Sequence, residues 1–193
     1  PHAVFLECRH GLYSEWSDRV AAILGKYSPV VEMASVGEAY LDLAGTERLF
    51  GPPLAAAHAL LQEITATTGL PCSAGLARTR LVAKVASDQA KPHGLLWVPA
   101  GSEETFLAPL GVRRIPGIGK VTEAALHAAG IETVRQLAAV TERTLEKEFG
   151  RWGTALYRKA RGGDTYEFLE DAEPKSISHN HTFSFDTDDR AAI

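Results

Sequence analysis

The chain has 193 residues, of which 45% are apolar and 23% are charged, and its net charge is −4. This composition is ordinary for a soluble globular protein, and the chain contains no low-complexity run. No apolar stretch approaches the roughly 18 residues that cross a bilayer, no signal-peptide pattern is present, and two cysteines lack metal-type spacing, so we expect a cytoplasmic protein with no membrane partner.

Charge is distributed unevenly along the chain. Residues 72–120 contain seven basic and three acidic side chains, a net charge of +4, whereas residues 1–71 and 121–193 each carry −4. A basic stripe on an acidic body fits a polyanion that binds one face of the molecule. Chance clustering on a solvated surface is the alternative.

The first hundred residues alternate between helical and strand-like patterns. Apolar residues from Leu12 to Tyr27 recur at helical spacing. We expect, in order, a helix at 12–27, a hairpin at 30–43, a helix from about 54 that stops at Gly69, a strand at 71–77, a helix at 79–90 and a strand at 95–98.

The pattern changes from Ser102 onward, where strand-like pieces give way to short helices separated by glycines. This change predicts a boundary near residues 100–108, with a mixed α/β unit before it and a small all-helical unit after it. The sequence turns acidic after Gly163 and β-like again from Lys175 to Phe185, which predicts one further strand.

Residues 34–42 carry the first motif, a Gly-Glu turn between two short β-prone pieces. The stretch resembles the palm hairpin of Y-family (translesion) DNA polymerases, which reads Ser-Ile/Leu-Asp-Glu-Ala-Tyr-Leu-Asp. In that family the Asp and Glu help to hold two divalent cations. Here Gly37 stands at the Asp position, and Glu38 is the catalytic and metal-binding residue that the resemblance implies. Without the resemblance, Glu38 reads as an exposed tip acid and Gly37 as a turn residue chosen for backbone freedom.

Residues 72–94 resemble a second stretch of the same palm, which ends in Ala-Lys-Pro-x-Gly. By that match Lys91 is the lysine that contacts the incoming triphosphate, for which a flexible ammonium is suited. Arg78 and Arg80 keep the basic character of the stretch, although Thr79-Arg80 replaces the common Asn-Lys, and we expect both arginines at the DNA backbone. A solvated lysine at a helix end is the alternative for Lys91.

Residues 113–131 have the pattern of a helix-hairpin-helix, in which a Gly-x-Gly turn joins two short helices. Two glycines let the backbone approach a phosphate closely, and the amides at the start of the second helix point outward with a favourable dipole. We expect Gly117, Gly119 and Lys120 to bind the DNA backbone, a contact that fixes position without reading sequence. Gly-rich turns between helices are also common without any ligand.

The resemblance extends from about Val4 to the end of the chain. It implies a Y-family polymerase of the bacterial DNA polymerase IV type, with a UmuC-like catalytic domain. The implied fold is α+β: a mixed-sheet palm remainder with packed helices at 1–105, an all-α helix-hairpin-helix thumb at 106–172, and a linker with the first strand of a little-finger domain at 173–193. The family's N-terminal strand, its first catalytic Asp and most of the fingers are expected before Pro1, and the rest of the little finger after Ile193.

The implied function is template-directed nucleotidyl transfer in damage bypass, with two Mg²⁺ ions, a DNA primer-template and a deoxynucleoside triphosphate. A sliding clamp would be contacted through parts that are not in this chain. Two-metal transfer needs several converging carboxylates, and the chain supplies Glu38 alone, so we expect it to be inactive as written. The alternatives are a naturally non-catalytic scaffold of the same family and a helix-hairpin-helix module that only binds DNA.

Overall fold

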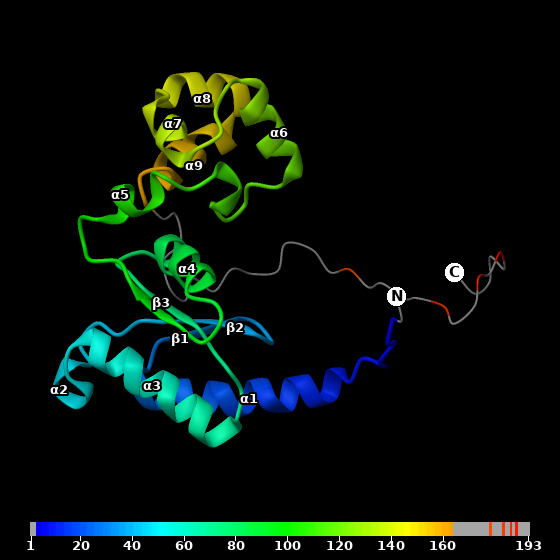
Figure 1. Cartoon of the computed structure of the whole chain (residues 1–193), viewed down its shortest axis with the longest axis vertical. Helices are drawn as coiled ribbons and strands as arrows, with labels where there is room; N and C mark the ends of the chain where they lie inside the picture. The colour runs from blue at the N-terminus through cyan, green and yellow to red at the C-terminus, as the bar shows by residue number, and fades with distance from the viewer. Residues whose placement is uncertain (1–2, 164–177, 179–182, 184–185, 187, 189–193) are drawn as a thin grey trace.

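The structure is a computed structural model that describes residues 3–163 together with residues 178, 183, 186 and 188. It has a mixed half of helices and short strands, followed by a half built of helices (Figure 1). The elements are α1 (His10–Tyr27), β1 (Val31–Ser35), β2 (Glu38–Leu41), α2 (Glu47–Phe50), α3 (Pro53–Thr68), β3 (Ala74–Leu76), α4 (Arg80–Gln89), β4 (Leu95–Trp97), α5 (Glu103–Leu107), η1 (Val112–Arg114), α6 (Lys120–Ala128), α7 (Val134–Ala139), α8 (Glu142–Phe149) and α9 (Arg151–Lys159).

The four strands form two separate two-stranded sheets. β1 and β2 pair antiparallel with Val31 opposite Leu41, and the register shifts between Met33 and Ser35. β3 and β4 pair parallel, and α4 is the helix that connects them. Gly75 lets α4 lie directly on β3, because a Cβ at this position would collide with the carbonyl oxygen of Ala83.

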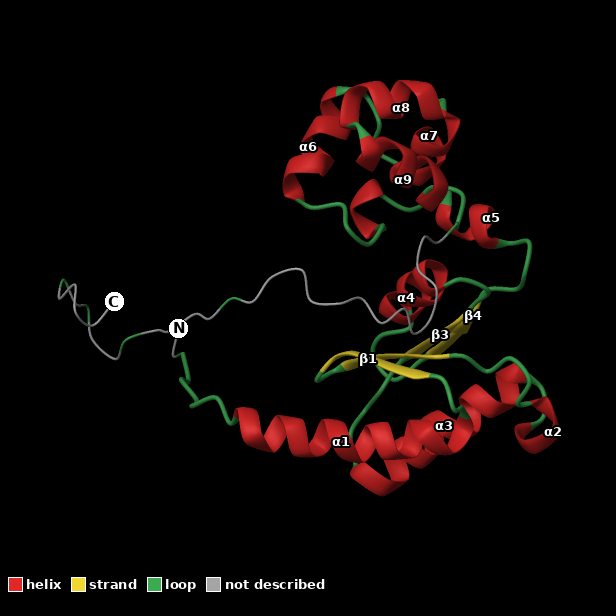
Figure 2. Ribbon diagram, turned by 180° about the vertical axis from the view of Figure 1, so that it is seen from behind, coloured by secondary structure: helices red, strands yellow, loops and turns green. Residues whose placement is uncertain are grey.

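The strands lie between two helical layers, with α1 and α3 on one side and α4 on the other (Figure 2). The layer of α1 and α3 has its own apolar cluster, in which Tyr27 stacks on Phe50 with ring centroids 4.7 Å apart. Both helices present their apolar stripe to this cluster, as an amphipathic sequence requires. Its buried members are Ile23, Leu24, Tyr27, Leu60 and Ile64.

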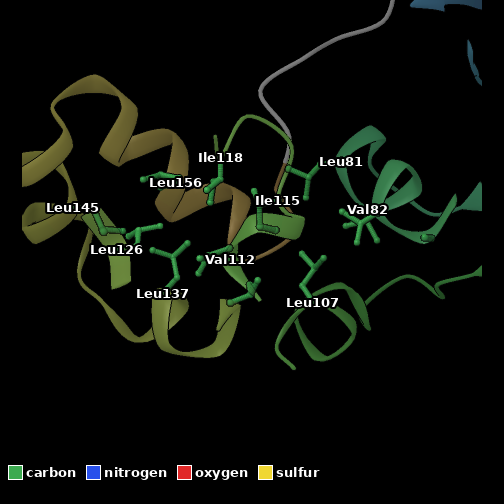
Figure 3. Packing of buried hydrophobic residues seen from close by; sticks show 14 of the residues in the cluster. Leu81, Val82, Leu107, Val112, Ile115, Ile118, Leu126, Leu137, Leu145 and Leu156 are labelled. Atoms are coloured by element: carbon green, nitrogen blue, oxygen red, sulfur yellow. The ribbon is translucent and has the colours of Figure 1, made fainter. Parts of the chain in front are cut away.

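A larger apolar cluster fills the helical half and continues into α4 (Figure 3). Leu81 and Val82 of α4 lie against this half with 4% and 0% of their surface exposed. The other buried members include Leu107, Val112, Ile115, Ile118, Leu126, Val134, Leu137, Leu145 and Leu156. One continuous core therefore joins α4 to helices α5–α9.

The predicted α+β class and the order of the elements in residues 3–163 are confirmed. Two differences are local. The short helix α2 was not predicted, because four residues are too few to show a period. The first helix of the predicted helix-hairpin-helix is only the three-residue 3₁₀ turn η1. The predicted strand within residues 173–193 lies outside the described residues except for the isolated positions 178, 183, 186 and 188, and the predicted boundaries at 105 and 172 stay predictions. Within the described part, no helix combines the length and apolarity needed to cross a membrane.

Candidate functional site

Gly37 lies in the turn between β1 and β2. Its φ is outside the left-handed region, and a Cβ placed on it would meet no atom within 4 Å. The backbone therefore does not require a glycine here, and the turn has room for a larger side chain. This geometry argues against the interpretation that Gly37 serves backbone freedom.

Glu38, the first residue of β2, is bound by a lysine from the neighbouring helix. Its Oε1 accepts a hydrogen bond from Lys84 Nζ of α4 at 2.6 Å. The Lys84 side chain is 23% exposed and that of Glu38 is 49% exposed. The tip carboxylate therefore has a fixed cationic partner, so it is not a free solvated acid.

The contact between Glu38 and Lys84 is the first of three in a row of alternating charges. Lys84 Nζ also lies 3.4 Å from Asp88 Oδ1, and Lys91 Nζ donates to the same oxygen at 2.7 Å. We call Glu38, Lys84, Asp88 and Lys91 the charge ladder. It links the hairpin tip to the lysine predicted to contact a triphosphate.

The ladder shifts the pKa of its two central groups. Burial lowers the pKa of Lys84, but the hydrogen bond to Glu38 and the charges of Asp88 and Glu38 outweigh burial and raise it above its ordinary value. Burial raises the pKa of Asp88, but the hydrogen bond from Lys91 and the charge of Lys84 outweigh it and lower the pKa. Both central groups are therefore held in their charged forms.

The two arginines predicted at the DNA backbone have different surroundings. Arg80 donates from both terminal nitrogens to Glu32 of β1, at 2.8 and 2.7 Å, and its guanidinium lies 4.1 Å from the centroid of the Tyr40 ring. Only 13% of its side chain is exposed. Arg78 is exposed, and no ion pair within residues 3–163 involves it. Of the two, Arg78 is therefore the more available to a ligand.

A cavity of about 910 Å³ lies between the two sheets. Every residue of 37–44, which includes β2, and of 71–80, which includes β3, lines it, so the backbone edges of both strands face the space. Apolar residues of α1 and α3 also line the cavity, as do Lys84, Ser87 and Lys91. Within the described residues β2 and β3 each have a single partner strand, so each presents an open edge to the cavity.

The described residues do not supply the ligands of a two-cation site. No three His, Cys, Asp or Glu side chains of the described part come together in a way that could hold a metal ion. Glu38 is already paired with Lys84. A pair of Mg²⁺ ions roughly 3.5–4 Å apart needs several oxygen ligands, and one paired carboxylate does not provide them.

The predicted phosphate-binding loop connects η1 to α6. Gly117 has a φ of +94°, and a Cβ on it would lie 2.8 Å from the ring of Trp152. Gly119 is the N-cap residue of α6 with a φ of −85°, a conformation open to any residue. Lys120 begins α6 and is exposed. The three predicted residues are thus adjacent on the surface, and only Gly117 must be glycine.

Sequence reasoning missed Lys84, Asp88 and Lys159. Lys84 and Asp88 follow the predicted residue Arg80 at intervals of four positions, so one face of α4 carries three charged side chains, and this pattern is visible in the sequence. The buried Lys159 of α9, which contacts the loop before α6, had no comparable signal because it lies 43 residues away in sequence.

Sequence comparison identifies two family patterns in the chain. The impB/mucB/samB family matches residues 1–88, and the thumb domain of DNA polymerase iota matches residues 113–164. A DNA polymerase IV from Dehalococcoides mccartyi is 41% identical over 187 residues, which cover 97% of this chain and 48% of the relative. A DNA polymerase IV from Streptomyces coelicolor is 38% identical over 196 residues, covering 100% of this chain and 41% of the relative. The chain thus spans about half the length of the curated relatives it matches.

Solved structures of DNA polymerases also resemble the chain. A DinB family error-prone DNA polymerase from Sulfolobus solfataricus superposes with a TM-score of 0.77 at 28% identity, covering 86% of this chain and 50% of the other. An insertion ternary complex of Dbh DNA polymerase gives a TM-score of 0.76 at 29% identity, covering 86% of this chain and 49% of the other.

Proposed function

The chain belongs to the Y family of translesion DNA polymerases, and from this premise we propose that it is the palm remainder and thumb of a DNA-directed DNA polymerase. The proposed activity of the complete enzyme is template-directed nucleotidyl transfer in damage bypass. Its substrates would be a DNA primer-template and a deoxynucleoside triphosphate, and its location the bacterial cytoplasm.

One observation carries the nucleotide part of the proposal: Glu38 and Lys91, 53 positions apart in the sequence, line the same cavity. Y-family polymerases use Mg²⁺ at the position of the hairpin acids and a lysine at the triphosphate. In this chain Glu38 would be a metal ligand and Lys91 would neutralise phosphate charge. With Gly37 beside Glu38, the chain by itself should not polymerise.

The open edges of β2 and β3 support a second element of the proposal. A strand inserted between them would join the two sheets into one and would satisfy backbone groups of both edges. We propose that this position belongs to the family's N-terminal strand, which carries the first catalytic Asp. An acid from that strand would then enter the cavity that Glu38 and Lys91 line.

In the helical half, Gly117, Gly119 and Lys120 would hold a DNA phosphate. Lysine contacts release counterions from DNA, so the affinity should fall as the salt concentration rises. The test is fluorescence anisotropy with labelled duplexes of several sequences over a series of KCl concentrations. Replacing Lys120 by Ala should weaken binding about equally for every sequence and reduce the salt slope by about 1.

The matched control for Lys120→Ala is Lys147→Ala, which removes the same charge from an exposed position on α8. Binding that ignores salt, or an unchanged slope in Lys120→Ala, would contradict the assignment of the loop.

A non-catalytic scaffold is the second candidate function. The observation that favours it is the pairing of Glu38 with Lys84 beside Gly37, because this arrangement leaves the tip without a free carboxylate. A scaffold would bind DNA with the same salt dependence and would show no synthesis even after the missing acids are restored.

A further inference from the structure

Two cationic side chains donate hydrogen bonds to backbone carbonyls of the loop between η1 and α6. We propose that Lys159 and Arg113 are positioning residues, which turn the backbone amides of Gly117 and Gly119 outward so that both can donate to one DNA phosphate. The inference rests on the proposed DNA contact of this loop and adds the residues that give the loop its binding geometry.

Lys159 reaches the loop from the last turn of α9. Its Nζ donates to the carbonyl oxygen of Pro116 at 3.2 Å and lies 5.8 Å from the centroid of the Trp152 ring. Only 9% of the residue is exposed. A buried ammonium is unfavourable unless its hydrogen bonds are satisfied, and the Pro116 carbonyl satisfies one of them. At this burial Lys159 cannot itself contact DNA, so its action must pass through the loop.

Arg113 holds the other end of the same loop. Its Nη1 donates to the carbonyl oxygen of Ile118 at 3.1 Å. The amide of Ile118, which lies between the two glycines, is bonded to the carbonyl of Ile115 at 3.0 Å. The two contacted carbonyls therefore belong to alternate residues, and the intervening amide is already used inside the protein.

The planar geometry of the peptide bond means that these contacts also fix the direction of the Gly117 and Gly119 N–H groups. In a planar trans peptide the carbonyl of one residue and the N–H of the next point in opposite directions. Because the Pro116 carbonyl faces Lys159, the N–H of Gly117 faces away from it. The same reasoning applies to the Ile118 carbonyl, Arg113 and the N–H of Gly119. Within the described residues, neither glycine amide donates to a protein acceptor.

The loop also packs closely on Trp152. A Cβ on Gly117 would lie 2.8 Å from the Trp152 ring, so a side chain at this position would collide with it. The positive charge of Lys159 behind the loop also adds to the positive end of the α6 dipole in front of it. Two outward amides, a helix N-terminus and a buried cation then act on the same anion.

The test compares three variants of the full chain by duplex anisotropy across KCl concentrations, with circular dichroism as the check on folding. Lys159→Met keeps an unbranched apolar stem and removes the charge and the donor, and we expect it to lower DNA affinity about tenfold, the effect of losing one charge-assisted hydrogen bond. The salt slope should stay that of the wild type, because no phosphate-contacting cation is lost. Lys159→Arg should restore binding, and Lys147→Met, the matched surface control, should bind as the wild type does.

Nuclear magnetic resonance can distinguish a positioning role from a role in stability alone, because it reports on the amides of Gly117 and Gly119 directly. Titration of inorganic phosphate should shift the ¹⁵N–¹H signals of Gly117 and Gly119 in the wild type and much less in Lys159→Met. If Lys159→Met does not fold, Arg113→Met replaces it, since the Arg113 side chain is 44% exposed and its loss leaves the core intact. The Gly119 signal is then the one that should lose its response.

The outcomes separate this inference from the proposed function. A folded Lys159→Met variant with wild-type affinity overturns the positioning role alone, and a slope reduced by about 1 would mean that Lys159 contacts phosphate directly. A wild-type chain that does not bind DNA overturns the DNA-binding proposal, and the positioning role with it.

Discussion

Arg80 and Glu32 join α4 to β1 through two hydrogen bonds of 2.8 and 2.7 Å, formed by both terminal nitrogens of the guanidinium. This planar two-point contact is one that a lysine cannot make. The Tyr40 ring on which the guanidinium lies belongs to β2, so one arginine contacts both strands of the hairpin. Arg80 therefore holds the hairpin that carries Glu38 against α4.

Replacing each of the two neighbouring arginines by methionine should separate stability from DNA binding. Arg80→Met leaves the partly buried Glu32 carboxylate without its partner and should lower the free energy of unfolding by about 1–3 kcal/mol. Arg78→Met, at an exposed position, should change it by less than about 0.5 kcal/mol but should weaken duplex binding and reduce its salt slope. Urea unfolding and anisotropy measure the two effects. Equal stability of the two variants would contradict the structural role of Arg80.

The charge ladder should make stability depend on pH at both ends of the scale. The pKa of Asp88 is lowered by folding, so its contribution is present above the ordinary value of 3.8 and is lost as the pH falls through the folded pKa. The pKa of Lys84 is raised, so its contribution is present below 10.5 and is lost as the pH rises through the folded pKa. Thermal unfolding from pH 3 to 11 should therefore show a flatter profile for Lys84→Met than for the wild type. Parallel profiles would mean that the ladder contributes nothing to folding.

The two glycines of the loop between η1 and α6 should respond differently to alanine. Gly117→Ala places a Cβ against Trp152 at a positive φ, and we expect it to destabilise the helical half by about 1–3 kcal/mol and to weaken DNA binding. Gly119→Ala meets only Arg113 at 3.9 Å and has an ordinary φ, so its stability should remain within about 0.5 kcal/mol of the wild type. Calorimetry on both variants decides the point. A stable Gly117→Ala protein would show that Trp152 does not fix the loop.

An aspartate at the hairpin tip should matter only when the chain is joined to the segments that flank the matched region in a full-length relative. The 193-residue chain should extend no primer with Mg²⁺ or Mn²⁺, before or after Gly37→Asp. A chimera that carries the matching upstream and downstream segments of the Dehalococcoides mccartyi DNA polymerase IV before Pro1 and after Ile193 should gain extension by orders of magnitude from the same change. The open space around Gly37 admits the new side chain without a clash.

The control for the chimera is Gly37→Asn, because asparagine has nearly the same shape as aspartate but carries no charge. Primer-extension gels on all the proteins give the result. Robust synthesis by the unmodified chain would contradict the inactive assignment, and a chimera that does not respond to Gly37→Asp would favour the scaffold.

Lys91 should affect nucleotide use more than duplex binding. In the active chimera, Lys91→Ala removes the ammonium that we assign to the triphosphate, and the KM for the nucleotide should rise at least tenfold, about 1.4 kcal/mol. Duplex affinity should stay within about twofold, as it should in the surface control Lys147→Ala. Equal losses of nucleotide use and duplex binding would make Lys91 a DNA-backbone or folding residue.

Much of the fold was predictable because each element follows a strong local rule. Helix α1 repeats apolar residues at helical spacing up to Tyr27, and α3 starts after Pro52 and ends at Gly69, which adopts the left-handed cap conformation. The hairpin also needs only local information, since its turn separates two short β-prone pieces. The division into two sheets was not predictable, because it depends on which strand edges meet in space.

The candidate site was predictable only where residues resemble a known motif. Glu38, Lys91 and Gly117 were singled out in this way. The contact of Lys84 with Glu38, across 46 positions, and that of Lys159 with Pro116, across 43, could not be predicted because these partners come together only through folding. Arg80 is a similar case. Its charge predicted a contact with DNA, but the sequence could not predict that its guanidinium would bind Glu32.

The core shared between α4 and the helical half restricts how such proteins can recombine. A gene crossover between α4 and α5 would set a foreign thumb against Leu81 and Val82, which are almost completely buried at this contact. The other face of α4 packs directly on Gly75 of β3. A crossover on the N-terminal side of α4 would therefore disturb the contact between the helix and this strand. Viable hybrids between relatives should therefore be those whose incoming thumb preserves side-chain volume at Leu107 and Ile115, and drift in either half should be tolerated most readily away from α4.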